Sequence, residues 1–219
     1  MKKSFVVIGL GRFGSNVART LAEMKCDVLA IDVKEESVKS VSRQIPHCVI
    51  ADATKYEVLS ELGAGTTDHA VVAIGGNLQA SILTIVNLKK LNVKNITVRA
   101  DVEEHKELFE MVGATEVIIP EEASAVSLAN QINSDSILDY HIVADDYVMV
   151  KIIVGKKFVP KTLIEMDIRN NFDVNIVGII KNDIFAIPHG TDKINPNDIV
   201  VVAGKKPNIR KFDAFLNNQ

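Results

Sequence analysis

The sequence predicts an α/β fold in which a doubly wound parallel sheet is followed by a small α+β lobe. Short, continuous apolar runs alternate with amphipathic helical segments, and a glycine-rich turn joins the first run to the first helix. This alternation stops after Pro120, and strand-rich sequence with a different rhythm begins near Val148. We therefore expect two domains, residues 1–134 and residues 135–219.

Six apolar runs are the predicted strands of the first domain. Unbroken apolar runs are typical of strands that are buried on both faces of a parallel sheet. They cover residues 5–8, 28–31, 48–50, 70–74, 96–98 and 117–119. The helices are expected between them, at residues 13–24, 35–42, 56–62, 77–91 and 103–112.

A long helix over residues 123–132 and a polar connection over residues 133–139 are expected to lead into the second domain. The apolar stripe of that helix is wide enough to pack against its own sheet and against a neighbouring subunit, so we expect a dimer at minimum. Strands are predicted at residues 148–154, 175–181, 184–186 and 199–203, a short helix near residues 162–165, and a closing helix over residues 206–216.

Composition indicates an ordinary globular chain, with 219 residues, 47% hydrophobic and 24% charged. The net charge of -3 does not favour binding of the chain to nucleic acid or anionic lipid. No apolar run approaches the roughly 20 residues that span a bilayer. We expect a cytoplasmic protein with no nucleic-acid partner and no direct membrane insertion, in which Cys26 and Cys48 are structural thiols.

The stretch "VVIGLGRFG" places Gly9, Gly11 and Gly14 directly after the first predicted strand and at the start of a helix. In a Rossmann-like fold the first glycine permits a tight turn, the second lets a phosphate approach, and the third lets helix and strand pack closely. Asp32 ends the second strand, where its carboxylate can accept hydrogen bonds from ribose hydroxyls. The pattern predicts an adenosine-type nucleotide, and the alternative is a structural tight turn.

Further polar residues follow the ends of the predicted strands. Arg12 lies inside the glycine turn, next to Phe13, and can reach a terminal phosphate or be a solvated loop arginine. Asp52, Ala53 and Thr54 end the third strand. They can contact an adenine edge, form an Asx-type cap on the next helix, or do both.

The remaining strand ends belong to the same predicted site. "AIGGNLQAS" brings Ile74, Gly75 and Asn77 to the end of the fourth strand, while Arg99 follows the fifth strand and Glu121 follows the sixth. Because the carboxyl ends of parallel strands share one edge of the sheet, we expect these residues to line one crevice.

Catalytic patterns are missing from the sequence. It contains no GxSxG, HExxH or Walker-type lysine motif, and His141 and His189 are isolated. We therefore expect binding without turnover. The alternatives are a small NAD(H)-dependent oxidoreductase, which needs a proton-transfer group facing the nicotinamide, and an NAD(H) redox sensor such as a transcriptional repressor, which needs a basic recognition helix with a wing.

Several blocks resemble, in order, the cytosolic gating subunits of Ktr and Trk potassium transporters, which are built from an RCK domain. They are "VVIGLGRFG", "AIDV", "ADAT", "VVAIGGNLQASILT", "ITVRA", "MVGATEVIIPEEA" and "DIRNNFDVNIVGI". The resemblance covers nearly the whole chain. The length matches the KtrA or KtrC type, a TrkA-like RCK N-lobe followed by a small RCK_C lobe.

This resemblance implies a homo-dimer that assembles into an octameric ring on the cytoplasmic face of a membrane potassium-translocating subunit of the KtrB or KtrD kind. ATP and ADP would favour different ring shapes. Carried over by position, the phosphates would contact Gly9, Gly11, Arg12 and Gly14, the ribose would contact Asp32, and the adenine would contact residues 52–54.

The resemblance also implies two further ligands. Glu121 matches a family glutamate associated with a divalent cation, Mg or Ca, although beside Glu122 it can equally favour a helix N-terminus. Cyclic di-AMP would bind the RCK_C lobe between two subunits, with its phosphates on Arg169 and Asn175 and its bases on Ile164, Ile168 and Ile176. The alternatives are that these isoleucines are core residues and that Arg169 pairs with Asp167 or Asp173.

Overall fold

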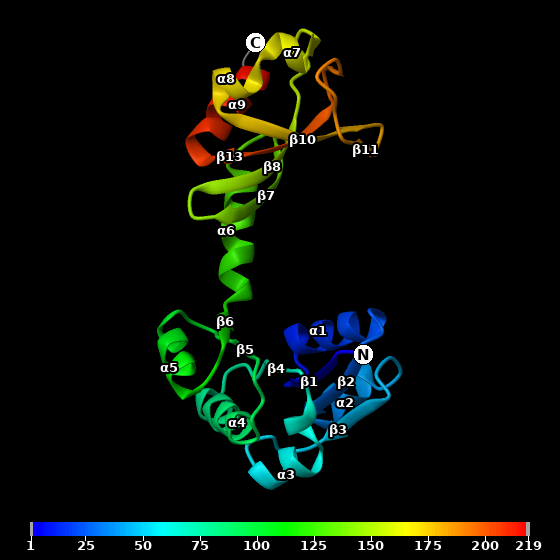
Figure 1. Cartoon of the computed structure of the whole chain (residues 1–219), viewed down its shortest axis with the longest axis vertical. Helices are drawn as coiled ribbons and strands as arrows, with labels where there is room; N and C mark the ends of the chain where they lie inside the picture. The colour runs from blue at the N-terminus through cyan, green and yellow to red at the C-terminus, as the bar shows by residue number, and fades with distance from the viewer. Residues whose placement is uncertain (1, 218–219) are drawn as a thin grey trace. The chain divides into compact units, whose positions relative to one another are not determined.

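The computed structural model describes residues 2–217, which form two compact units, Met1–Glu121 and Glu122–Gln219 (Figure 1). This division lies earlier than the predicted boundary after residue 134, because helix α6 (Pro120–Ile132) belongs largely to the second unit. Ser127 Oγ donates to the Tyr140 carbonyl at 2.6 Å, and Gln131 Nε2 donates to the Leu138 carbonyl at 2.7 Å. These bonds fix α6 to the strand that follows it.

The first unit contains a six-stranded sheet in the order β3-β2-β1-β4-β5-β6, and every neighbouring pair is parallel. The strands are β1 (Ser4–Ile8), β2 (Asp27–Asp32), β3 (His47–Ile50), β4 (His69–Val72), β5 (Ile96–Arg99) and β6 (Glu116–Ile118). The predicted doubly wound parallel sheet is confirmed. The strand order reverses between β1 and β4, which is where open α/β sheets bind ligands.

Helices cover both faces of this sheet. They are α1 (Arg12–Glu23), α2 (Glu35–Val41), α3 (Tyr56–Glu61), α4 (Leu78–Lys90) and α5 (Glu104–Val112), with a 3-10 turn η1 (Ala64–Thr66) after α3. Val6 and Ile8 pack in the core beneath α3, α4 and α5, while Val7 packs in the core beneath α1 and α2. Successive residues of β1 thus point to opposite faces, which explains its unbroken apolar sequence.

The second unit contains a five-stranded antiparallel sheet in the order β11-β10-β13-β8-β7. Its strands are β7 (Ile137–Ala144), β8 (Tyr147–Ile153), β10 (Val174–Lys181), β11 (Ile184–Ala186) and β13 (Ile199–Lys205). A separate two-stranded pair joins β9 (Lys161–Thr162) to β12 (Lys193–Ile194). The helices are α7 (Leu163–Met166), α8 (Ile168–Phe172) and α9 (Lys206–Asn217).

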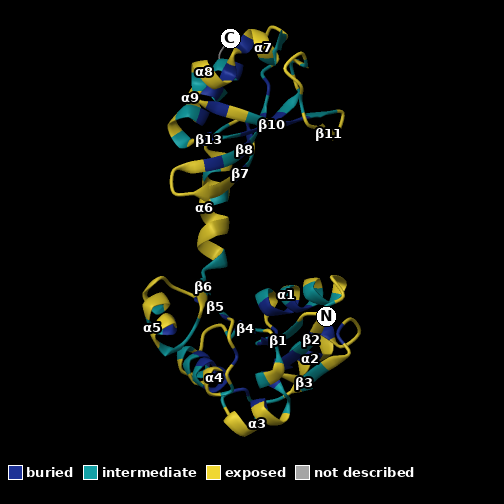
Figure 2. Ribbon diagram, viewed as in Figure 1, coloured by how far each residue is buried: buried dark blue, intermediate teal, exposed yellow. Residues whose placement is uncertain are grey.

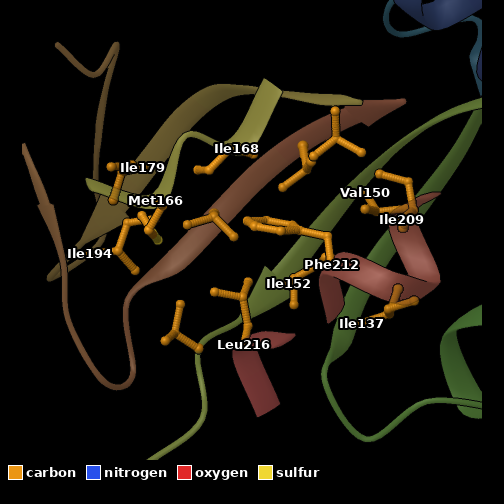
Figure 3. Close-up of a cluster of buried hydrophobic side chains, with 14 of the residues drawn as sticks. Ile137, Val150, Ile152, Met166, Ile168, Ile179, Ile194, Ile209, Phe212 and Leu216 are labelled. Carbon is orange, nitrogen blue, oxygen red and sulfur yellow. The ribbon is translucent and has the colours of Figure 1, made fainter. Parts of the chain in front are cut away.

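The core of the second unit lies between its sheet and α9. Figure 3 shows the side chain of Phe212 projecting from α9 into the buried cluster that also contains Ile152 and Ile168. Phe212 and Ile152 are completely buried. The closing helix is therefore an integral part of the core.

The prediction of a polar connection over residues 133–139 is wrong for its last three residues, which begin strand β7. Only Ile137 and Tyr140 of this strand are buried, so its sequence lacks the apolar alternation of a half-buried strand. It forms because it pairs with β8, with Tyr140 opposite Val150. Helix α8 and the short strands β9 and β12 were also not predicted. α8 starts after Asp167, whose φ of 41° reverses the chain without a glycine.

Helix α6 buries none of its residues in the described chain, and Figure 2 shows it exposed along most of its length. Leu128 is 56% exposed and Ile132 is 75% exposed. The expectation that its apolar stripe packs on a sheet of its own subunit is wrong. The apolar stripe is present on the helix but is not covered within residues 2–217.

Candidate functional site

The turn from β1 into α1 depends on two glycines. Gly9 has a φ of +90°, and a Cβ on it would lie 2.7 Å from the carbonyl of Ala73. A Cβ on Gly14 would collide with the carbonyl oxygen of Gly9. Gly11 differs, because a Cβ there would meet nothing within 4 Å. The backbone at Gly11 is therefore open to a ligand at the N-terminus of α1.

A cavity of about 1050 Å³ opens at the carboxyl edge of the parallel sheet. Every residue assigned to this site from the sequence lines it except Gly14, which packs beneath the turn. The lining residues assigned in advance are Gly9, Gly11, Arg12, Phe13, Asp32, Asp52, Ala53, Thr54, Ile74, Gly75, Asn77, Arg99 and Glu121. The structure thus brings together residues from all six strand ends.

Sequence reasoning missed Val33, Lys34 and Ser37, which also line the cavity. They follow Asp32 in the connection to α2, and Lys34 precedes the first residue of that helix. The signal that could have found them is their position directly after the acidic end of β2.

Asp32 holds the glycine turn as well as facing the cavity. Its Oδ2 accepts the Leu10 N–H at 2.6 Å, and its Oδ1 accepts the Lys34 N–H at 2.8 Å. A carboxylate oxygen has a further lone pair after one such bond. Asp32 can therefore accept ribose hydroxyls without releasing either backbone amide.

Asp52 forms an Asx-type turn. Its Oδ1 accepts the Thr54 N–H at 3.0 Å and the Thr54 hydroxyl at 2.6 Å. The hydroxyl bond is the main reason that the pKa of Asp52 lies below its usual value. Helix α3 itself has no side-chain cap. The alternative prediction, a cap by these residues on the next helix, is wrong, because the bonds of Asp52 stay within the turn that precedes α3. The Asp52 side chain is 41% exposed at the cavity.

Arg99 is clamped between two carboxylates at the end of β5. Its Nη1 lies 2.7 Å from Asp101 Oδ1, and its Nη2 lies 2.6 Å from Glu121 Oε1. The hydrogen bond to Glu121 raises the pKa of Arg99 and lowers that of Glu121. The Arg99 side chain is only 16% exposed, and its Nε is buried without a hydrogen-bond partner in the described chain.

Glycine at position 75 makes room for this arginine, because a Cβ there would lie 2.9 Å from Arg99 Nη1. The next residue, Gly76, donates its N–H to Asp101 Oδ2 at 2.9 Å. Asn77 accepts the Ala80 N–H at 3.0 Å and so caps α4. The turn after β4 and the Arg99 cluster are therefore built as one unit.

Glu121 does not lie in a ready-made metal site. Within residues 2–217 no group of three or more His, Cys, Asp or Glu side chains is placed to hold a metal ion. One oxygen of Glu121 is already paired with Arg99. Arg12 is exposed at the start of α1 and forms no ion pair within the described chain.

The residues assigned to the second ligand are only partly accessible. Ile164 on α7 is 67% exposed, whereas Ile168 is 7% exposed and belongs to the core, as the alternative for it predicted. Arg169, on α8, and Asn175, on β10, are exposed, while Ile176 is half-buried.

Neither aspartate that could neutralise Arg169 does so. Asp167 accepts hydrogen bonds from Asn170 at 2.8 and 3.0 Å, and Asp173 accepts one from Asn208 at 3.1 Å. Arg169 forms no ion pair with the described residues. Its guanidinium therefore remains available to an anion.

The doubly wound sheet, the glycine turn and the acidic end of β2 define a protein with a Rossmann-like nucleotide-binding domain. The TrkA-N domain model matches residues 5–120, and the TrkA-C domain model matches residues 147–217. The chain belongs to the TrkA-N and TrkA-C family of RCK regulatory subunits.

Two relatives match over nearly their full length. The chain is 38% identical over 214 residues to Ktr system potassium uptake protein C of Bacillus subtilis, covering 97% of each chain. It is 36% identical over 212 residues to Ktr system potassium uptake protein A of the same organism, covering 96% of each. Potassium uptake systems are thus where its relatives act.

Solved structures share the fold. The GsuK RCK domain matches with a TM-score of 0.69 and 14% identity, covering 99% of this chain and 48% of that one. The GsuK channel bound to NAD matches with a TM-score of 0.68 and 14% identity, covering 99% of this chain and 40% of that one. The chain spans less than half the length of these proteins. Among residues 2–217, no helix is long and apolar enough to cross a membrane.

Proposed function

We propose that this chain is the cytoplasmic, nucleotide-binding gating subunit of a Ktr-type potassium transporter, and that it regulates without catalysing a reaction. The cavity at the carboxyl edge of the first unit, formed around the glycine turn, is the observation that carries the proposal. Its occurrence in a chain 38% identical to a Ktr system protein over 97% of both lengths supports the transporter class.

ATP and ADP are the ligands that suit the cavity best. Phosphates lie against the open backbone at Gly11 and the N-terminus of α1, where Arg12 adds a free positive charge. The ribose binds Asp32, and the adenine lies toward residues 52–54. Asp32 disfavours the 2'-phosphate of NADPH by charge repulsion. NAD(H) remains the alternative ligand.

The nucleotide regulates only if it binds two conformations of the protein with different affinities. The clamp of Arg99 between Asp101 and Glu121 is suited to that task, because a terminal phosphate competes with Glu121 for the same guanidinium. Glu121, once released, can share a divalent cation with the phosphates. That cation then needs further ligands from the nucleotide or from a second subunit.

The second unit binds cyclic di-AMP in this proposal. Arg169 and Asn175 are exposed and take the phosphates, while Ile164 and Ile176 contact the bases. A two-fold interface offers each phosphate one arginine, so one ligand binds per dimer. Ile168 supports this surface from the core rather than touching the ligand.

The partners are further copies of this chain, assembled as dimers into an octameric ring, and a separate membrane subunit that conducts potassium. The ring transmits the nucleotide-dependent change of shape to that subunit. The exposed apolar stripe of α6 supports contact between copies.

Equilibrium titration of the purified full chain with ATP, ADP, NADH and cyclic di-AMP tests the proposal. We expect saturable binding of ATP and ADP, and separate binding of cyclic di-AMP. Tight NADH binding with no response to ATP or ADP would instead support the NAD(H) sensor.

A further inference from the structure

A second cavity, of about 410 Å³, lies within the second unit between α6, the β7–β8 hairpin and α9. It includes none of the residues assigned to either nucleotide ligand. Its apolar floor consists of Ile137, Val148 and Ile209, which are 9%, 1% and 2% exposed. The cavity is therefore a structured part of the core surface and falls within the size range of small-molecule sites, about 300–1000 Å³.

A buried tyrosine is among the residues that line this cavity. Tyr140 is 7% exposed and lines the cavity. The structure shows no hydrogen bond from its hydroxyl to any other group of residues 2–217. Burial raises the pKa of this phenol, and the charge of Arg210 opposes that shift. The hydroxyl thus stays protonated at neutral pH, with a hydrogen available for donation.

The cavity has an excess of positive charge. Lys206 and Arg210 lie one turn apart on α9, and neither forms an ion pair within the described chain. The one acidic lining residue, Asp213, already accepts hydrogen bonds from the Ser136 hydroxyl at 2.5 Å and from Asn217 Nδ2 at 2.9 Å. Two positive charges thus face one negative charge in the lining, and the lysine and arginine remain without a carboxylate partner in the described chain.

We propose that this cavity binds a small organic anion with an apolar body, whose acidic group contacts Arg210 and Lys206 and whose body rests on the floor of Ile137, Val148 and Ile209. The Tyr140 hydroxyl donates to the same acidic group. Carboxylate and phosphate share this chemistry, and both are stronger partners for a guanidinium than a neutral acceptor is.

The test uses 1-anilinonaphthalene-8-sulfonate, an apolar ring system with one negative charge, as a fluorescent probe on the full chain. We expect saturable binding, and Arg210→Gln should weaken it at least about tenfold because a charge-assisted bond is lost. Tyr140→Phe keeps the ring and removes one donor, so it should weaken binding about threefold to tenfold.

Lys211→Gln is the matched control, because Lys211 is the exposed neighbour of Arg210 on α9 and does not line the cavity. It removes the same charge from the chain and should leave probe affinity unchanged. Equal affinity of the wild-type, Arg210→Gln and Lys211→Gln proteins, with unchanged thermal unfolding, would overturn the proposal. So would absence of saturable binding, the result expected if a second copy of the chain covers the cavity.

Two additions define the ligand further. Displacement of the probe by 4-phenylbutyrate or by phenyl phosphate shows which acidic group is preferred, and displacement by neither overturns the proposal. Saturating ATP should not change the Arg210-dependent binding. This measurement with ATP separates the proposed anion cavity from the proposed nucleotide site, since ATP binding can fail while the probe still binds.

Discussion

Gly14 is the residue whose replacement the nucleotide-binding turn can tolerate least. A methyl group there would collide with the carbonyl oxygen of Gly9, a residue that itself has no room for a Cβ beside the backbone of Ala73. We expect Gly14→Ala to destabilise the first unit by about 2–4 kcal/mol and to abolish ATP binding. Chemical denaturation and ATP titration check this. Gly11→Ala is the control for stability, because its Cβ has open space.

Asp32 should decide which nucleotide the cavity accepts. Its carboxylate repels a 2'-phosphate, while Arg12 favours a terminal phosphate. ATP and ADP should therefore outcompete NADPH in a competition titration, and Asp32→Asn should reduce that preference. Tighter binding of NADPH than of ATP by the wild-type chain would refute the assignment.

The ion pair of Glu121 with Arg99 predicts a pH dependence. Arg99 lowers the pKa of Glu121 below its ordinary value of 4.5 in the folded protein. The stabilisation is therefore complete above that ordinary value and is lost as the pH falls through the lower, folded-state pKa. Wild type should be more stable than Glu121→Gln at about pH 7, and the two should converge below about pH 4. Urea unfolding at both pH values measures the difference.

Helices α7 and α8 present Ile164 and Arg169 as exposed groups, although both helices are short. Thr162 and Glu165 form a capping box that fixes α7, with Thr162 N–H donating to Glu165 at 2.7 Å. The capping box fixes the start of α7, and the buried side chains of Met166 and Ile168 anchor the segment that carries Arg169 to the core of the second unit.

Arg169→Ala should weaken cyclic di-AMP binding at least about tenfold, because each of two subunits loses a charge-assisted bond of about 1.5–3 kcal/mol. ATP affinity should stay the same. Calorimetry on the full chain measures both ligands. The control is Lys211→Gln, which removes a charge from another helix of the same unit and lies in neither proposed site. An unaltered cyclic di-AMP isotherm in the Arg169→Ala variant would contradict the proposal that Arg169 binds this ligand.

We expect assembly of the whole protein to use surface that a single chain leaves uncovered. The stripe on α6 includes Leu128 and Ile132, both more than half exposed. We expect a dimer at minimum and an octamer in solution, and we expect Leu128→Glu with Ile132→Glu to shift the population toward smaller species. Light scattering at micromolar concentration checks this. A wild-type monomer would contradict it.

The first unit could be predicted from the sequence almost completely. Each buried strand carries an apolar run because both of its faces are covered, and the glycines mark a turn that no other residue can form. The candidate nucleotide cavity followed from one rule, that parallel strands end at one edge. Val33, Lys34 and Ser37 were missed there because side chains after a strand end have no pattern of their own. The other lining residues not assigned from the sequence are Ile8, Ala51, Ala73 and Ala80.

The sequence by itself determined the fold class, the shared edge at which the parallel strands end and the family, since these depend on local patterns of hydrophobicity and on glycine. Only the tertiary structure decided the rest. β7 exists because β8 pairs with it, and α6 belongs to the second unit because its side chains bond to β7. The clamp on Arg99 and the cavity beside Tyr140 also join residues distant in the chain. Contacts of this kind depend on which distant segments come together in the fold, and local sequence patterns do not determine those pairings.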